Sequence, residues 1–187
     1  MKIKETFFDG EVKLLEPTVY RDSRGFFMEA YREDTLANLG LPSMYRQDNL
    51  SGSVKNVIRG LHFQWSPAMS KLMRVNVGTA YLVAVDIRIG SPSFGKWIGV
   101  EASADNKLQL FAPAHFARGF CVLSEYAEIH YKCTAIYNKA FESGILFSDP
   151  DIGIEWPVKN PILSDKDVTA QTIKEWVNKP ESKKFLY

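Results

Sequence analysis

Three side chains that could do chemistry lie within six residues of one another, in the segment Arg59-Gly-Leu-His-Phe-Gln64. A neutral imidazole such as that of His62 can take up a proton near neutral pH. In a regular strand Arg59 and His62 would face opposite sides, because side chains alternate along a strand. Gly60 permits a β-bulge that could return both side chains to one pocket. The segment alone favours a buried structural histidine that is hydrogen-bonded to a backbone carbonyl.

A tyrosine and a lysine are further candidates, because the alternation of apolar residues turns both inward. In Ala127-Glu-Ile-His-Tyr-Lys-Cys-Thr134, Tyr131 shares its face with the apolar residues. In Lys71-Leu-Met-Arg-Val-Asn-Val77, Lys71 also shares its face with apolar residues. A buried ammonium group is costly, so Lys71 either extends from a strand end to solvent or lines a site for anionic groups.

The length of 187 residues predicts a single domain over residues 1–187. The 23 Lys and Arg residues nearly balance the 22 Asp and Glu residues, which argues against binding to nucleic acid or to an anionic membrane surface. No apolar run has the length of a signal-peptide core or a membrane-spanning helix, so we expect a cytoplasmic protein. Cys121 and Cys133 belong to no CxxC pair, and we expect both to be reduced core residues.

Short apolar runs separated by turn residues predict an antiparallel β-sandwich or barrel. The predicted strands cover residues 57–63, 71–77, 80–87, 97–102, 108–112, 119–123 and 127–134. Before them, an extended N-terminal arm turns at residues 21–25 and resumes as a strand at Phe26.

Two helices are predicted, from Glu33 to Leu39 and from Ser164 to about Asn178. Ser164 and Asp167 resemble a capping box, so the carboxylate of Asp167 has a structural explanation as a helix cap. The polar residues 179–184 are expected to fray.

Eight segments occur in an order that resembles one known enzyme family. They are Arg24-Gly-Phe-Phe, Gln47-Asp-Asn, Arg59-Gly-Leu-His-Phe-Gln, Ala84-Val-Asp-Ile-Arg, Ser91-Pro-Ser-Phe-Gly-Lys-Trp, Tyr131-Lys-Cys-Thr, Asp151-Ile-Gly-Ile-Glu-Trp-Pro and Leu163-Ser-Asp-Lys-Asp. This ordered set resembles the nucleotide-sugar epimerases of the dTDP-4-dehydrorhamnose 3,5-epimerase family. The resemblance implies an all-β, cupin-type jelly roll with a core over about residues 20–157 and a C-terminal helical arm over about residues 164–178.

The resemblance also implies an isomerase that inverts C3, C5 or both in a nucleotide-linked 4-keto-6-deoxyhexose of deoxysugar biosynthesis. His62 would be the base, Asp167 its orienting carboxylate, and Tyr131 the acid on the opposite face of the sugar. The C4 ketone acidifies the neighbouring C–H bonds, and reprotonation from the other face inverts the carbon. Lys71 matches the position that stabilises the enolate oxygen at C4.

By the same resemblance, further positions match residues that contact the substrate, basic ones suiting a pyrophosphate and amides or carboxylates suiting sugar and base. They are Arg24, Glu29, Gln47, Asn49, Arg59, Arg118, Glu142 and Lys166. A homodimer is expected in which the arm near Arg24 and Glu29 reaches the partner's pocket. The histidines form no HxH pair and no GxGxxG follows a strand, so we expect neither a metal nor a dissociable cofactor.

Two positions depart from the family pattern. Arg118 stands where the family commonly has an active-site histidine, and Leu82 stands where members often have an acidic residue. A longer, permanently charged side chain in the pocket would restrict how the sugar turns, so Arg118 favours inversion at one carbon over two. Two alternatives stay open: a single-centre epimerase of another nucleotide-linked deoxysugar, and a non-catalytic cupin that binds a nucleotide sugar or glycan. The nucleotide, whether dTDP, CDP, GDP or UDP, is left open as well.

Overall fold

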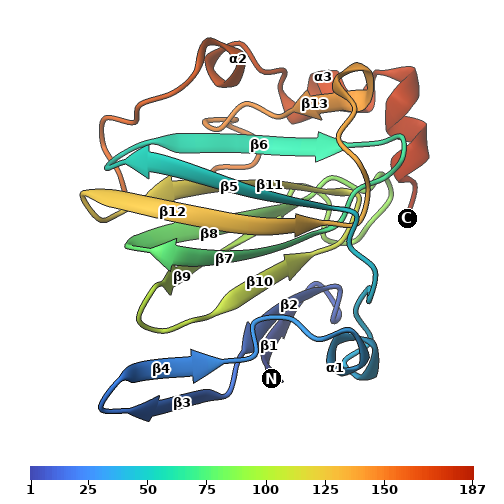
Figure 1. Cartoon of the computed structure of the whole chain (residues 1–187). Coiled ribbons are helices and arrows are strands. Elements are labelled where there is room, and N and C mark those ends of the chain that lie inside the picture. The colour runs from blue at the N-terminus through green and yellow to red at the C-terminus, as the bar shows by residue number, and fades with distance from the viewer.

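The computed structural model describes residues 1–187 and contains two large antiparallel sheets that face each other (Figure 1). The six-stranded sheet consists, in spatial order, of β1 (Lys2–Phe7), β2 (Val12–Glu16), β10 (Gln109–Ala112), β7 (Lys71–Val77), β12 (Tyr126–Cys133) and β5 (Gln47–Val54). The five-stranded sheet consists of β13 (Glu142–Gly144), β6 (Ile58–Gln64), β11 (Phe116–Val122), β8 (Thr79–Asp86) and β9 (Trp97–Ser103). This arrangement confirms the predicted antiparallel sandwich.

Seven short elements lie outside the two sheets. They are the hairpin strands β3 (Val19–Asp22) and β4 (Gly25–Met28), the helices α1 (Glu33–Asn38), α2 (Asp165–Val168) and α3 (Ile173–Val177), and the 3₁₀ helices η1 (Lys139–Phe141) and η2 (Pro180–Phe185).

The seven strands predicted from apolar runs are all present, although β11 begins at Phe116 rather than at residue 119. Strands β1, β5 and β13 were not predicted. Strand β5 reads Gln-Asp-Asn-Leu-Ser-Gly-Ser-Val and has no apolar run, because it is an edge strand that pairs only with β12. Backbone pairing, rather than side-chain burial, therefore defines this strand.

The space between the two sheets is filled by apolar side chains from both, because alternate residues of each strand point inward. Leu82, Leu110, Phe116 and Ile129 are fully buried members of this core. Burying one such side chain stabilises the fold by about 1.5–3 kcal/mol. The same inward alternation places the polar side chains of the candidate site between the sheets.

The C-terminal segment covers the outer face of the five-stranded sheet, beside β13 and the end of β6 (Figure 1). Phe63 of β6 packs against Trp176 and Phe185, with ring centroids 4.6 and 5.5 Å away. The prediction that the last residues fray is wrong, because Phe185 is fully buried in this cluster and residues 180–185 form η2. An apolar anchor in a polar stretch is enough to dock the chain end.

The prediction of one helix from Ser164 to about Asn178 is also wrong. Helix α2 ends at Val168, and α3 begins at Ile173 with an N-cap of its own. Thr172 and Glu175 form a full capping box, in which each side chain bonds the backbone N–H of the other. This box starts a new helix and so breaks the continuous one.

Helix α1 and the residues next to it cover part of the outer face of the six-stranded sheet. Leu36 of α1 is fully buried in a cluster with Leu15 and Leu72. The helix stops before Gly40, which has φ of +68° and suits the left-handed end of a helix. The predicted helix at Glu33–Leu39 is therefore confirmed, with Leu39 as its C-cap.

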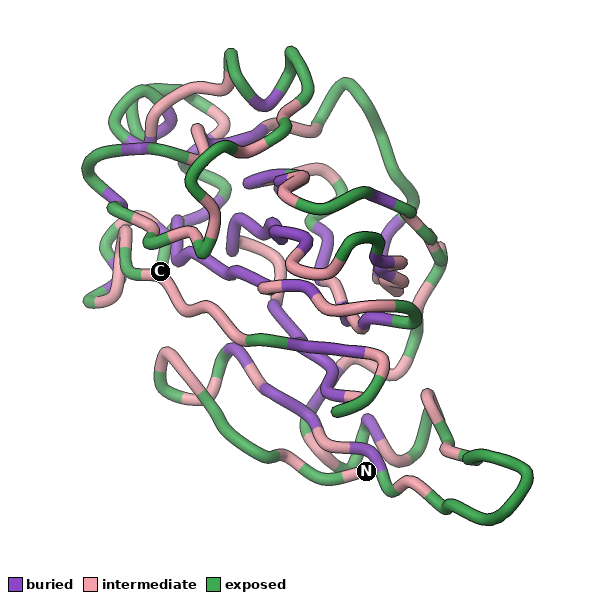
Figure 2. The backbone as a smooth tube through the Cα atoms, turned by 90° about the vertical axis from the view of Figure 1, so that its left-hand side faces the viewer, coloured by how far each residue is buried: buried purple, intermediate pink, exposed green.

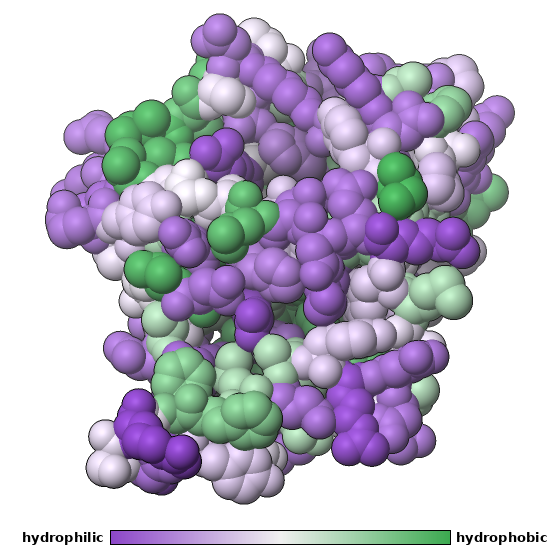
Figure 3. Space-filling view, viewed as in Figure 1, coloured by the Kyte–Doolittle hydropathy of each residue, from purple (hydrophilic) through white to green (hydrophobic).

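The hairpin of β3 and β4 projects from the sandwich and is mostly exposed, as the green loop beside the N-terminus shows in Figure 2. Tyr20, Phe26 and Phe27 are 63%, 51% and 70% exposed. In Figure 3, pale green side chains lie next to deep purple ones over this hairpin. Exposed aromatic residues next to charged ones are typical of an interaction surface.

The segments that begin at Ala84 and Ser91, two of those that resemble the family, come together around the buried carboxylate of Asp86 and not at a substrate pocket. Asp86 is fully buried and accepts hydrogen bonds from the guanidinium of Arg88 and from the hydroxyls of Ser91 and Ser93. Burial alone would raise the pKa of Asp86, but these donors lower it below its usual value. A buried charge with so many donors fixes the turn between β8 and β9.

Cys121 and Cys133 are both free and buried, which confirms the prediction for them. None of the helices has the length and apolar composition that crossing a membrane requires.

Candidate active site

His62 of β6 and Asp167 of α2 form the central pair of the site. His62 Nε2 lies 2.6 Å from Asp167 Oδ1. The ionised carboxylate accepts the Nε2–H, which leaves the lone pair of a neutral imidazole on Nδ1. Burial alone would raise the pKa of Asp167, but the hydrogen bond and charge of His62, with a hydrogen bond from Ser164, lower it. An ionised Asp167 therefore orients His62 as a proton acceptor.

The start of α2 holds Asp167 in place. The Oγ of Ser164, the N-cap residue, accepts from the backbone N–H of Asp167 and donates to its Oδ2 at 2.8 Å. The reciprocal bond from the Ser164 backbone N–H to the Asp167 carboxylate is not formed. Helix capping thus explains the position of Ser164, whereas Oδ1 of Asp167 is left free to face the imidazole of His62.

A β-bulge brings Arg59 to the same face as His62. On β11, Arg118 pairs with His62 and Phe120 pairs with Arg59, so that Gly119 alone lies opposite two residues of β6. Arg118 and Phe120 are two residues apart on β11 and therefore share a face. Their partners His62 and Arg59 on β6 share that face as well. The bulge needs glycine, because a Cβ at Gly60 would lie 2.6 Å from the Gly119 Cα. The guanidinium of Arg59 donates from Nε to Ser53 at 3.0 Å and lines neither cavity described below.

Tyr131 and Lys71 reach the site from the six-stranded sheet, on β12 and β7. Lys71 Nζ lies 4.9 Å from the centre of the Tyr131 ring, a favourable cation–π distance. Burial raises the pKa of Tyr131, so its phenol keeps its proton at neutral pH. Burial, with the nearby charge of Arg118, lowers the pKa of Lys71 to about 8. The sheet thus presents a neutral acid beside an ammonium group that titrates close to neutrality.

Two adjoining cavities meet at His62 and Glu142. The first, about 420 Å³ in volume, is lined by His62 and Glu142 together with Gln47, Asn49, Lys71, Tyr131 and Tyr137, among others. The second, about 300 Å³ in volume, is lined by His62 and Glu142 together with Lys166 and Asp167, among others. Lys166 forms an ion pair with Glu142. The two cavities thus bring together eight of the twelve predicted site residues, His62 included.

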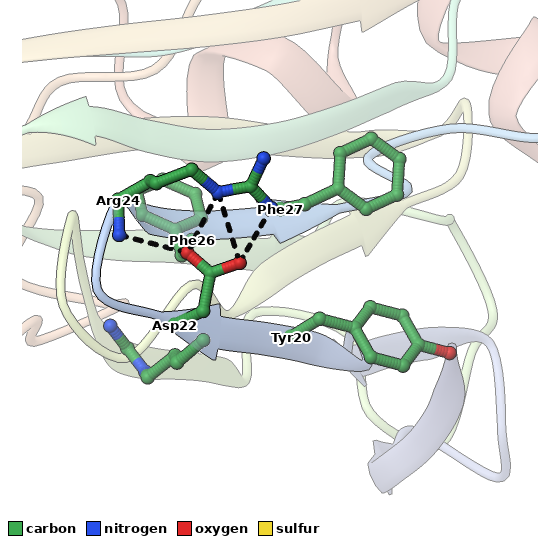
Figure 4. Close-up of a pocket in the computed structure, with 6 residues that line it drawn as sticks. Tyr20, Asp22, Arg24, Phe26 and Phe27 are labelled. Atoms are coloured by element: carbon green, nitrogen blue, oxygen red, sulfur yellow. Dashed lines mark hydrogen bonds and ion pairs between the residues drawn. The ribbon is translucent and has the colours of Figure 1, made fainter.

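Arg24 and Glu29 do not reach these cavities within one chain. Arg24 lies on the hairpin turn, where its guanidinium bonds the Asp22 carboxylate at 2.7 Å beside the rings of Phe26 and Phe27 (Figure 4). The hairpin forms an open cavity with a volume of about 540 Å³, and none of the residues that line it lines either cavity at His62. Glu29 lies 3.8 Å from Arg32.

Arg118 is buried and lines neither cavity. Its Nη1 donates to the carbonyl oxygens of Met69, Ala112 and Pro113, at 2.7, 3.3 and 3.2 Å. The expectation that Arg118 takes up room in the pocket is not met, because three backbone carbonyl groups hold its buried guanidinium away from the residues that line the cavities. Bulk at position 118 therefore gives no reason to prefer a single inverted centre.

Tyr137 is a cavity residue that the sequence analysis missed. Its hydroxyl donates to Glu142 at 3.0 Å, and its backbone N–H donates to the Gln47 side chain at 2.7 Å. It lies beyond the end of β12, outside any regular pattern of alternation. Only its place in the chain, four residues after Cys133 and shortly before η1, could have indicated that it lies at the site.

Within the chain, no three His, Cys, Asp or Glu side chains converge as a metal site. His130 faces away from the core and lies 3.6 Å from Asp48, and the His115 ring lies 4.6 Å from that of Phe185.

Comparison with known proteins agrees with this geometry. The family model described as dTDP-4-dehydrorhamnose 3,5-epimerase matches residues 9–175. The dTDP-4-dehydrorhamnose 3,5-epimerase of Shigella flexneri is 53% identical over 86% of this chain and 90% of that protein. The dTDP-4-dehydrorhamnose 3-epimerase of Streptomyces niveus is 34% identical over 86% of this chain and 79% of that protein.

A solved structure extends the likeness to the fold. The crystal structure of dTDP-6-deoxy-D-glucose-3,5-epimerase from Legionella pneumophila, in complex with dTDP-4-keto-L-rhamnose, superposes with a TM-score of 0.89 and is 41% identical. The match covers 95% of this chain and 94% of that one. The cupin-type jelly roll expected from the sequence is thereby confirmed. This chain belongs to the dTDP-4-dehydrorhamnose 3,5-epimerase family.

Proposed function

We propose that this protein is an epimerase that inverts C3 and C5 of a dTDP-linked 4-keto-6-deoxyhexose. One observation carries the proposal: the base His62 and the acid Tyr131 come from opposite sheets and line the same cavity. Inversion needs a proton taken from one face of a carbon and another returned to the opposite face. A site with a single acid–base group could exchange a proton but would return it to the same face.

His62 starts the reaction by taking the proton at C3 or C5 through Nδ1. The two electrons of the C–H bond form a C=C bond to C4, and the ketone oxygen becomes an enolate. Asp167 stabilises the resulting imidazolium, to which it is already hydrogen-bonded. The ammonium group of Lys71 stabilises the negative oxygen in a pocket with little water.

Tyr131 completes the inversion by donating its phenolic proton to the opposite face of the same carbon. The enolate returns to the ketone, the imidazolium of His62 releases its proton to solvent, and the tyrosinate takes one up from solvent. No net oxidation occurs, so the chemistry itself requires no redox cofactor. A second round at the other carbon uses the same groups once the sugar has turned.

The remaining cavity residues suit a nucleotide diphosphate sugar. Lys166 provides positive charge for phosphate, whereas Gln47 and Asn49 provide amides for sugar or base hydroxyl and carbonyl groups. The first cavity, at about 420 Å³, is in the range of sites that bind small molecules. dTDP is the nucleotide named for the relatives, and we propose it for this chain on that ground.

We further propose that the protein acts as a homodimer in which the hairpin of one copy completes the pocket of the other. The exposed aromatic residues of the hairpin, and the position of Arg24 far from its own cavities, support this arrangement. A single domain over residues 1–187 and a cytoplasmic location stay predictions.

Product analysis tests the proposed function. The protein is incubated with dTDP-4-keto-6-deoxyglucose, the ketone is trapped by borohydride reduction, and the configurations at C3 and C5 are read by NMR. We expect inversion at both carbons. Inversion at C3 alone would favour the single-centre alternative, for which the Streptomyces niveus relative is the precedent. Unchanged sugar would instead favour the non-catalytic binding protein.

A further inference from the structure

Arg118 is a buried cation with no carboxylate partner. Its side chain is 3% exposed, and none of the ion pairs of the structure includes it. Nη1 has three carbonyl acceptors, but the buried Nε and Nη2 atoms have no hydrogen-bond partner. Although burial lowers the pKa of Arg118 to about 10, the guanidinium stays charged at neutral pH. An uncompensated buried charge of this kind is costly and calls for a reason.

The three carbonyl groups lie on both sides of Lys71. Met69 precedes Lys71 by two residues, and Ala112 of β10 is the cross-strand partner of Lys71 in the ladder between β7 and β10. Pro113 follows Ala112. One guanidinium nitrogen therefore holds together the two backbone segments that position Lys71.

Arg118 also lies near enough to Lys71 for its charge to act on the ammonium group. Its ladder partner on β6 is His62, so both side chains lie on the inner face of the five-stranded sheet, which faces β7. The groups that act on the Lys71 ammonium come from several elements: Arg118 of β11 and Lys166 of α2 repel it, whereas Glu142 of β13 attracts it, as would Cys133 of β12 if its thiol were ionised. Among these groups, Arg118 has the largest effect on the pKa of Lys71.

Leu82 explains why no carboxylate neutralises Arg118. In the ladder between β8 and β11, Arg118 pairs with Ala84 and Phe120 pairs with Leu82, so Leu82 lies on the same inner face as Arg118. An acidic side chain at position 82 would have been a diagonal neighbour of the guanidinium. Leu82 is instead fully buried in the apolar core. The two departures from the family pattern thus act together and leave a fixed, unpaired positive charge on the inner face of the five-stranded sheet.

We propose that Arg118 is a positioning residue for Lys71. It fixes the backbone on both sides of Lys71, and it places the ammonium group beside a positive charge that no carboxylate balances. The negative enolate oxygen neutralises this excess positive charge when it forms. The role of Arg118 in catalysis rests on the proposed function. Its electrostatic effect on Lys71 does not, because that effect is present in the protein without substrate. Because Lys71 acts as a cation, activity is present below its pKa and is lost as the pH rises through that value.

The test compares Arg118→Met and Arg118→His with wild type. For wild type, the basic limb of kcat/KM and the midpoint of Lys71 acetylation by acetic anhydride, followed by mass spectrometry, should both lie near the pKa of about 8. Both variants remove the permanent charge, so both midpoints should rise by about half a pH unit or more. Arg118→His guards against a folding defect, because histidine is the residue that the family commonly has there.

Arg74→Met is the matched control. Arg74 lies on the same strand as Lys71 but three residues away, on the outer face of the sheet, and also has a buried Nε without a partner. This variant should leave both midpoints where they are in wild type. If Arg118 were only a structural clamp, its variants would lose activity equally at every pH, with unmoved midpoints, and the inference would be overturned. If the acetylation midpoint rose in both Arg118 variants but wild type did not epimerise the sugar, the proposed function would be contradicted and the electrostatic effect of Arg118 on Lys71 would stand.

Discussion

His62 and Asp167 are separated by 105 residues in the chain, and yet Nε2 of the imidazole lies 2.6 Å from Oδ1 of the carboxylate. This contact joins the middle of β6 to the short helix α2. It selects the tautomer of His62 that has its lone pair on Nδ1, and it keeps the ring from turning.

Asp167→Asn should lower kcat by about 10²–10⁴-fold, because an amide can bond the imidazole without stabilising the imidazolium. Steady-state kinetics at neutral pH would measure this loss. Asp165→Asn is the matched control, since it alters an exposed acidic residue in the first turn of the same helix. Equal activity of Asp167→Asn and Asp165→Asn would mean that the carboxylate of Asp167 does not take part in the reaction.

Tyr131→Phe should retain exchange of substrate protons with solvent while inversion falls steeply, because only the second half of the reaction loses its donor. Deuterium incorporation and product configuration, measured on one sample, separate the two steps. Tyr126→Phe changes an exposed tyrosine on the same strand and should leave both unchanged. Full inversion by Tyr131→Phe would exclude it as the acid.

The hairpin should mediate dimerisation. We expect a dimer in sedimentation equilibrium at micromolar concentration, and we expect Phe27→Ser to shift the protein toward monomer with a loss of activity. Ile162→Ser, which changes an exposed residue outside the hairpin, should have neither effect. A wild-type monomer with full activity would contradict the proposed arrangement.

Phe185→Ala should lower the free energy of unfolding by about 3–5 kcal/mol, because it removes a fully buried ring that packs on Phe63. Denaturant unfolding measures the change. Leu186→Ala, at a neighbouring residue that is 63% exposed, should change stability by less than about 1 kcal/mol. Similar small effects for both variants would mean that the chain end is not docked in solution.

The fold could be predicted largely from the sequence, because alternation of apolar residues is a local signal. This signal predicts the central strands and places Tyr131 and Lys71 on the inward face of their strands. The same reasoning failed at Gln47–Val54, which has little to bury, and at the C-terminal end, where one phenylalanine anchors a polar stretch. It also overlooked the Thr172–Glu175 capping box that splits the predicted helix.

The site could be predicted only in part from the residues themselves. The pairing of His62 with Asp167 depends on the path of the chain over 105 residues, which no local pattern records. The possible bulge at Gly60 was visible in the sequence, but its effect on Arg59 depends on the register with β11. Arg118 was identified as a departure, whereas its contacts with three carbonyl groups became visible only in the folded chain.

The incorporation of deuterium into product formed in heavy water tests the central claim most directly. With dTDP-4-keto-6-deoxyglucose as substrate, wild type should place deuterium at both C3 and C5 with inversion at both carbons, and His62→Ala should place it at neither. Equal exchange at these carbons by His62→Ala and wild type would contradict the assignment of His62 as the base.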